Sequence, residues 1–190
     1  MTPRTKFVLL VLVFMLPTLA SFIVFYFFPP DRTTNYGMLI SPVVTLPEVD
    51  LVRLDSGKEP VVPGLRGKWL MITRDSGLCE AACRNKLQAM KQARLILGRE
   101  QDRVLRVVLV DDDVSPSAAL QNTYGGTVWI PANSLPWLST LPAAPDDASG
   151  RSAIYAADPL GNIFMRYPAE PDIKRLSNDL QRVLKASQIG

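Results

Sequence analysis

The sequence predicts an α/β domain preceded by one membrane-spanning helix. Three observations support this prediction: a long apolar stretch near the N-terminus, a strand–helix–strand alternation that begins at residue 68, and a cysteine pair where the first strand meets the helix. With 190 residues, the chain has room for one domain and a short appendage.

The apolar stretch covers residues 7–28, where 19 of 22 residues are apolar. A helix of this length would be roughly 33 Å long, enough to cross the roughly 30 Å hydrocarbon core of a bilayer. Arg4 and Lys6 precede the stretch and only Arg32 follows closely, so the positive-inside rule places residues 1–6 in the cytoplasm. We therefore expect a protein of the inner (cytoplasmic) membrane with a periplasmic domain.

A cleaved signal peptide is the alternative interpretation of the same stretch, with residues 18–20 as a weak cleavage site. Against it, the apolar run continues for eight residues past Ala20, which a mature N-terminus would not need. In either case the domain would lie in an oxidising compartment, where a disulfide persists.

The composition excludes several classes of function. The chain has no histidine, which rules out Ser-His-Asp and Cys-His nucleophile systems, His-ligated zinc and haem c attachment. The formal net charge is +3, but Arg4 and Lys6 supply two of these charges, and the rest of the chain has 19 basic and 18 acidic residues. A nearly neutral domain has no basic surface for phosphate, so we expect no nucleic-acid partner.

The domain is expected over residues 47–190, after a linker over 29–46. The segment up to about residue 67 is rich in proline, and its short apolar runs, such as Val43-Val44 and Val61-Val62, predict small strands or a hairpin.

Regular elements are predicted from residue 68 onward. A strand over 69–73 and a near-continuous apolar strand over 104–110 flank a helix over 80–97. The apolar residues of this helix recur at helical spacing: Cys83, Leu87, Met90, Ala93 and Leu97.

The C-terminal half continues this α/β pattern. It predicts a short helix near 117–122, a strand over 127–130, a hairpin formed by 153–157 and 163–167, and a last amphipathic helix opened by Pro171. The order strand, helix, strand, hairpin, helix is that of thioredoxin. The predicted fold is therefore thioredoxin-like, with an N-terminal extension.

Cys79 and Cys83 are the only cysteines of the chain. A thiol in the first turn of a helix is favoured as thiolate by the helix dipole and the free N–H groups, and Asp75 or Ser76 is expected to cap this helix. Four residues apart, the two sulfurs are expected on one helical face, close enough for a disulfide or for one soft metal ion.

Two other interpretations of the pair stay open. A structural disulfide is one, although so short a loop removes only about 2 kcal/mol of unfolded-chain entropy. Two free cysteines buried in the core are the other, since Cys83 belongs to the apolar stripe.

Four segments together resemble the Sco (SenC) family over roughly residues 47–185. They are the Gly-Lys-Trp-Leu at 67–70, the Cys-x-x-x-Cys pair, the Val-Asp-Asp at 110–112 and the Tyr-x-x-x-Pro-x-Gly at 155–161. The resemblance implies a membrane-anchored, extracytoplasmic copper chaperone and thiol reductase that helps to build the binuclear copper centre of cytochrome c oxidase.

The copper site of that family consists of two Cys and one His. Its thiolates map onto Cys79 and Cys83, but the His position falls near Gly150, where this chain has none. The proline that follows each family cysteine is replaced by Glu80 and Arg84. The chain is thus identified as a divergent member that lacks the copper-ligand His.

Copper binding without histidine has a chemical basis. Two thiolates alone hold Cu(I), and Met71, Met90 or Met165 is a candidate third soft ligand, although methionines on a strand or helix stripe usually belong to the core. Exchange between thiols and disulfides needs no histidine, so the departure favours dithiol chemistry.

The resemblance leads us to expect an assembly factor for respiratory haem-copper oxidase, acting on a copper-containing client subunit as thiol–disulfide reductant or Cu(I) carrier. Cys79 is expected to attack, because the N-terminal cysteine is usually more exposed, and Cys83 to resolve the mixed disulfide. A general extracytoplasmic thiol–disulfide oxidoreductase and a non-catalytic anchored scaffold with a structural disulfide are the alternatives.

Two further groups of residues have plainer expected roles. The Asp run at 111–113 is interpreted as a solvated strand exit rather than a cation site. Trp69, Trp129 and Trp137 are expected to be buried.

Overall fold

A computed structural model describes residues 2–27, 35–46, 54, 65–133, 139–143, 147 and 149–187. The chain divides into two units, Met1–Thr34 and Asn35–Gly190. The predicted strand at Val61-Val62 and the residue Trp137 lie outside the described residues.

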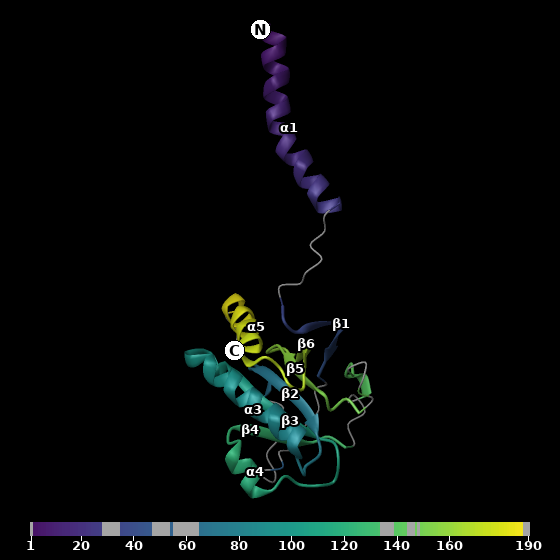
Figure 1. Cartoon of the computed structure of the whole chain (residues 1–190), viewed down its shortest axis with the longest axis vertical. Helices are drawn as coiled ribbons and strands as arrows, with labels where there is room; N and C mark the ends of the chain where they lie inside the picture. Colours follow the sequence, from purple (N-terminus) through teal and green to yellow (C-terminus); the bar gives the residue numbers. More distant parts are fainter. Residues whose placement is uncertain are drawn as a thin grey trace. The chain divides into compact units, whose positions relative to one another are not determined.

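The described part of the N-terminal unit is the helix α1 (Pro3–Phe27), which is drawn in purple in Figure 1. Its length and hydropathy suit a membrane crossing, and none of its residues is buried against protein. Pro17 lies inside this helix, as membrane helices tolerate. An N-terminal signal sequence has the same properties, so both interpretations of the segment are compatible with α1.

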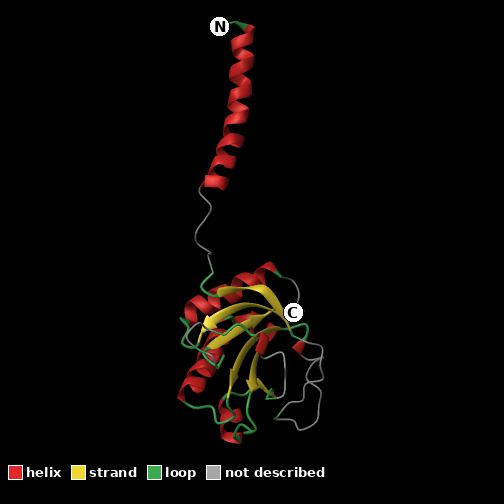
Figure 2. Cartoon of the chain, turned by 90° about the vertical axis from the view of Figure 1, so that its right-hand side faces the viewer, coloured by secondary structure: helices red, strands yellow, loops and turns green. Residues whose placement is uncertain are grey.

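A six-stranded sheet, drawn in yellow in Figure 2, forms the centre of the second unit. Its strand order is β1-β6-β5-β2-β3-β4. Strands β2, β3 and β4 are parallel, whereas β5, β6 and β1 continue the sheet in antiparallel pairs. The strand bounds are β1 (Met38–Thr45), β2 (Trp69–Asp75), β3 (Val104–Val110), β4 (Thr127–Pro131), β5 (Ala153–Ala157) and β6 (Asn162–Pro168).

The helices of this unit are α3 (Ala81–Ile96), α4 (Ala118–Thr123) and α5 (Ile173–Ala186), with a 3-10 turn η1 (Gly98–Arg103) after α3. The side chains of Ser117 and Asp172 cap α4 and α5 by accepting backbone N–H bonds at 3.2 and 3.0 Å. Helices α3 and α5 lie side by side over the sheet (Figure 1).

Each face of the sheet packs into its own apolar core. On the helix side, Leu87 and Met90 of α3 and Leu176 of α5 meet Val108 and Ile154 of the strands. On the opposite side, the strands contribute another set of buried residues, including Leu70, Ile72, Val107, Leu109 and Tyr155. The near-continuous apolar pattern of β3 follows from this burial on both faces.

The methionines and the described tryptophans behave as expected of core residues. Met71, Met90 and Met165 are buried in the helix-side core, and so are Trp69 and Trp129. The order of elements predicted after residue 68 is confirmed, with ends that differ from the predicted ones by at most two residues.

Strand β1 contains the apolar run Val43-Val44, for which a small strand was predicted, but its place in the chain departs from the predicted domain bounds. It pairs with β6, placing Met38 opposite Arg166 and Thr45 opposite Asn162, although it lies inside the predicted linker over 29–46. Residues 35–46 therefore belong to the folded unit, and the expected domain start at residue 47 is too late. An edge strand with mostly exposed side chains lacks the alternation on which strand prediction depends.

Candidate functional site

The loop between β2 and α3 is fixed by hydrogen bonds that its backbone amides donate. The amide of Cys79 donates to the carbonyl of Ser76 at 3.0 Å, and the amide of Gly77 donates to Asp112 Oδ1 at 3.0 Å. A Cβ at Gly77 would lie 1.6 Å from the carbonyl oxygen of Val114. At position 77, therefore, only glycine fits without moving the neighbouring backbone.

Cys79 and Cys83 form a disulfide with their Cα atoms 5.0 Å apart. Cys83 is the third residue of α3, but Cys79 precedes the helix with a φ of +46°, a left-handed conformation that non-glycine residues rarely adopt. The two cysteines therefore do not share a helical face, contrary to the prediction. Their exposed fractions are 0% and 1%, so exposure gives no reason to assign the attacking role to Cys79.

Helix α3 begins without a side-chain cap. Glu80 occupies the N-cap position and makes no capping hydrogen bond. Both predicted caps are wrong, because Asp75 is the last residue of β2 and the hydroxyl of Ser76 accepts from the amide of Leu78 instead.

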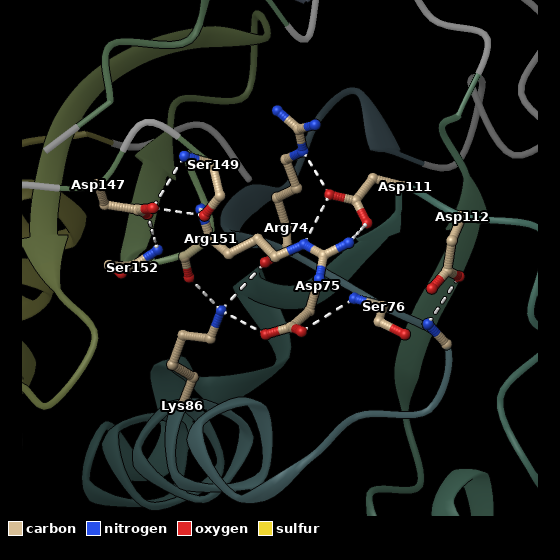
Figure 3. A network of polar contacts seen from close by, with 11 residues as sticks. Arg74, Asp75, Ser76, Lys86, Asp111, Asp112, Asp147, Ser149, Arg151 and Ser152 are labelled. Carbon is tan, nitrogen blue, oxygen red and sulfur yellow. Dashed lines mark hydrogen bonds and ion pairs between the residues drawn. The ribbon is translucent and has the colours of Figure 1, made fainter.

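Lys86 is a buried cation one turn after Cys83 in α3. Its side chain is 1% exposed, and Nζ lies 2.7 Å from Asp75 Oδ2 (Figure 3). The ammonium also donates to the carbonyl oxygens of Arg74, at 3.0 Å, and Arg151, so all three of its N–H groups have acceptors. Burial lowers the pKa of Lys86, and the hydrogen bond with Asp75 opposes this shift.

Asp111 joins two arginines beside this pair. Its carboxylate, 2% exposed, accepts from Arg74 Nε at 2.7 Å and from Arg151 Nη2 and Nε at 2.6 and 3.0 Å (Figure 3). Burial alone would raise the pKa of Asp111, but the hydrogen bonds from Arg151 and Arg74 outweigh burial and lower it. The interpretation of the Asp run as a solvated strand exit is therefore wrong for Asp111 and holds for the exposed Asp113.

A cavity of about 440 Å³ opens beside the disulfide. Its lining includes Cys83, Lys86, Asp75 and Arg151, with the exposed side chain of Leu78 at its edge. Cys79 does not belong to this lining. The cavity thus brings one sulfur of the pair next to the charged cluster.

The surroundings of the disulfide differ from the copper site that the resemblance implies. At the expected position of the His, Gly150 is followed by Arg151, whose guanidinium is bound to Asp111. Within the described ranges, no group of three His, Cys, Asp or Glu residues is placed to hold a metal ion. After reduction, Cys79 and Cys83 would offer a soft ion two thiolates, and the donor set fits Cu(I) better than Cu(II).

Lys86 and Arg151 were not among the predicted site residues. Lys86 lies three residues after Cys83 and four before Met90, so its position on the apolar stripe is a signal that could have identified it. Arg151 carries no comparable signal, because Asp111 lies 40 residues away in the sequence.

Comparison with known proteins gives a family and a fold. Residues 69–187 match the family model described as transmembrane-like, thioredoxin-like, C-terminal domain. No curated protein matches the sequence.

Solved structures with the same fold include Sco proteins. The SCO1/SenC family lipoprotein from Bacillus anthracis is 14% identical, with 75% of this chain and 98% of that chain covered and a TM-score of 0.56. Yeast Sco1 with copper bound is 13% identical, with coverage of 82% and 96% and a TM-score of 0.56.

A putative protein disulfide isomerase from Bacteroides thetaiotaomicron is 17% identical, with coverage of 80% and 95% and a TM-score of 0.55. At these identities the similarity establishes the fold. The predicted thioredoxin-like fold is confirmed, and so is the resemblance to Sco proteins at the level of structure.

Proposed function

Because this chain belongs to the transmembrane-like, thioredoxin-like family, we propose that it is a membrane-anchored thiol–disulfide reductant of the Sco kind. It acts through Cys79 and Cys83 on the cysteines of a client copper site. The observation that carries the proposal is the disulfide at the junction of β2 and α3, beside a cavity that one of its sulfurs lines. The proposed client, a copper-containing subunit of a respiratory haem-copper oxidase, follows from the resemblance to Sco proteins.

The chemistry needs only the two sulfurs. In the reduced chain, one thiolate attacks a client disulfide, which forms a mixed disulfide and releases one client thiolate. The second cysteine then attacks the mixed disulfide and releases the other client sulfur. Two electrons and two protons pass to the client, and the chain is left with the Cys79–Cys83 disulfide.

Delivery of Cu(I) as cargo is the second candidate function. The Cα separation of 5.0 Å brings the two sulfurs close enough to hold one ion after reduction. The guanidinium of Arg151 near the expected position of the His favours dithiol exchange over a three-ligand copper site.

The anchor and its orientation are also proposed. We place residues 1–6 in the cytoplasm and the domain in the periplasm, because Arg4 and Lys6 precede α1. A fusion of alkaline phosphatase to the C-terminus should be active and stay in the membrane fraction after a carbonate wash. Release of an active fusion would indicate a cleaved leader, and an inactive fusion the opposite orientation.

The redox test uses the full-length chain in detergent micelles, with a synthetic peptide disulfide as substrate. We expect the reduced chain to reduce one peptide disulfide per molecule, with a reduction potential above about −300 mV. The double variant Cys79→Ser/Cys83→Ser should be inactive, and Leu160→Ser, at an exposed position of the β5–β6 hairpin, is the control that should keep full activity. Absence of exchange together with a potential below about −300 mV would instead establish a structural disulfide.

The copper arm of the test is a titration of the same reduced chain with Cu(I) against a competing chelator. One-to-one binding that is lost in both single serine variants would support Cu(I) transport. Exchange without such binding would restrict the function to dithiol chemistry.

A further inference from the structure

We infer that Cys83, and not Cys79, is the sulfur that exchanges with the client, and that the client cysteine enters through the cavity beside it. The inference rests on the proposed function and assigns the order of its two steps. It reverses the assignment expected from the sequence, in which the N-terminal cysteine attacks.

Access to the pair is the first argument. Cys83 lines the cavity of about 440 Å³, whereas Cys79 does not and has no exposed surface. A cavity of this size accommodates a side chain and part of its flanking backbone, but not a folded domain. A client therefore reaches the pair with a cysteine on an extended segment, and the sulfur it meets is that of Cys83.

The electrostatic environment of the two sulfurs is the second argument. Cys83 lies in the first turn of a 16-residue helix whose N-cap side chain supplies no acceptor, so the helix N-terminus favours a thiolate there. The cations Lys86 and Arg151 line the same cavity, together with the carboxylates of Asp75 and Glu80. Lys86 and Arg151 are paired with Asp75 and Asp111, and the guanidinium of Arg84 donates to the carbonyl of Cys79, so the helix N-terminus is what distinguishes the sulfur of Cys83. Because Asp75 and two carbonyls already occupy the ammonium of Lys86, this group acts as a fixed charge and not as a proton donor.

Cys79 is placed to resolve the mixed disulfide. It lies outside the helix, in a left-handed backbone conformation, and its carbonyl oxygen accepts from Arg84 Nε at 3.0 Å. Its amide donates to the carbonyl of Ser76, so hydrogen bonds hold the backbone of this residue on both sides.

The two steps balance as follows. The Cys83 thiolate forms a bond to one client sulfur, the client S–S bond breaks, and the other client sulfur leaves as a thiolate that takes up a proton. Cys79 then loses its proton to solvent and attacks Cys83 Sγ, so that the bond between Cys83 and the client breaks and the second client thiolate is released.

Single-cysteine variants of the full-length chain test this assignment. In detergent micelles, Cys79→Ser and Cys83→Ser each keep one thiol, and 5,5′-dithiobis(2-nitrobenzoate) reports its reaction rate as a function of pH. We expect Cys79→Ser, which keeps Cys83, to react at least about tenfold faster at pH 7 and to form its thiolate at lower pH. Equal rates, or a faster Cys83→Ser, would overturn the inference while leaving the proposed function intact.

A blocked cavity provides a second measurement. Ala82 lines the cavity and its exposed neighbour Ala81 does not, so Ala82→Phe and Ala81→Phe form a matched pair. In the Cys79→Ser background, Ala82→Phe should slow the reaction several-fold and Ala81→Phe should leave it unchanged. Equal rates for the two would show that clients do not enter here. If the wild-type chain also fails to reduce the peptide disulfide, the proposed function itself is wrong.

Discussion

Among the described residues of this domain two cations are buried, Lys86 and Arg106, and their hydrogen bonding differs. Lys86, at the cavity, has an acceptor for each of its N–H groups and a carboxylate partner in Asp75. Arg106, on β3, is 3% exposed and donates to the carbonyl of Gly125, while its Nε and Nη1 atoms have no hydrogen-bond partner among the described residues.

Lys86 is thus a fully paired buried charge, whereas Arg106 is a buried charge with only part of its hydrogen bonds made. A buried ion costs several kcal/mol unless it is paired and hydrogen-bonded. The Lys86 site meets this condition by joining α3 to the C-terminal end of β2 and to the segment before β5. Burial lowers the pKa of both cations, but only Lys86 has a neighbouring carboxylate that opposes the shift. At the cysteine end of the sheet, buried charge therefore contributes to the structure.

Removing the paired cation should have the largest effect. Lys86→Met leaves the carboxylate of Asp75 buried without its partner, so the free energy of unfolding should fall by about 3–5 kcal/mol. Urea denaturation of the full-length chain, followed by tryptophan fluorescence, measures this change.

The exposed Lys174 on α5 supplies the control, and Lys174→Met should change the stability by less than about 0.5 kcal/mol. Adding Asp75→Asn to Lys86→Met should recover part of the loss, because the stranded charge is then removed. A Lys86→Met loss as small as that of the control would show that the pair does not stabilise the fold.

Asp111→Asn should be the next most damaging change. It removes the negative charge that two arginines share, but Arg74 and Arg151 are 27% and 40% exposed and regain water. We therefore expect a loss of about 2–3 kcal/mol by urea denaturation, less than for a fully buried pair. Asp113, two positions later, is exposed, so Asp113→Asn is the matched control and should leave the free energy of unfolding nearly unchanged.

The contribution of Asp111 should also depend on pH. Its pKa is lower in the folded chain than in the unfolded chain, so its stabilisation is complete above the unfolded pKa and is lost as the pH falls through the folded one. The stability difference between the wild type and Asp111→Asn should thus shrink when urea denaturation is repeated from about pH 6 down to about pH 2. A constant difference would mean that the carboxylate is not the stabilising species.

Arg106→Met should have the smallest effect and the opposite sign. An apolar side chain of similar length replaces a cation with two unsatisfied nitrogens, so we expect either no change or a gain of up to about 1 kcal/mol in urea denaturation. A loss of more than about 2 kcal/mol would show that Arg106 is as well paired as Lys86.

The predictable parts of the fold are the strands in which buried apolar residues follow one another in the sequence. The strand at 104–110 is apolar apart from Arg106, and the strand at 153–157 contains only Ala, Ile and Tyr, so both have the predicted bounds. For strand β1 only the short apolar run Val43-Val44 indicated a strand, and its full extent was not predicted because most of its residues are exposed. Its stability comes from pairing with β6, which no local pattern reveals.

The site was predictable only in part, for a similar reason. The cysteines were identified from their spacing and from the strand that precedes them. Their burial, the left-handed backbone of Cys79 and the charged groups around Cys83 depend on contacts between distant segments, such as that of Lys86 with the carbonyl of Arg151, 65 residues away.

Gly77, in the loop between β2 and α3, makes a more specific sequence pattern than the two cysteines alone. Many unrelated chains contain two cysteines four positions apart, but this loop also requires a residue without a Cβ two positions before the first, because the backbone at Val114 fills that space. The amide of Gly77 in turn requires an acceptor such as Asp112, 35 positions later. Sequences that combine Gly-x-Cys-x-x-x-Cys with an acidic residue at this distance are the ones in which the same loop should be sought.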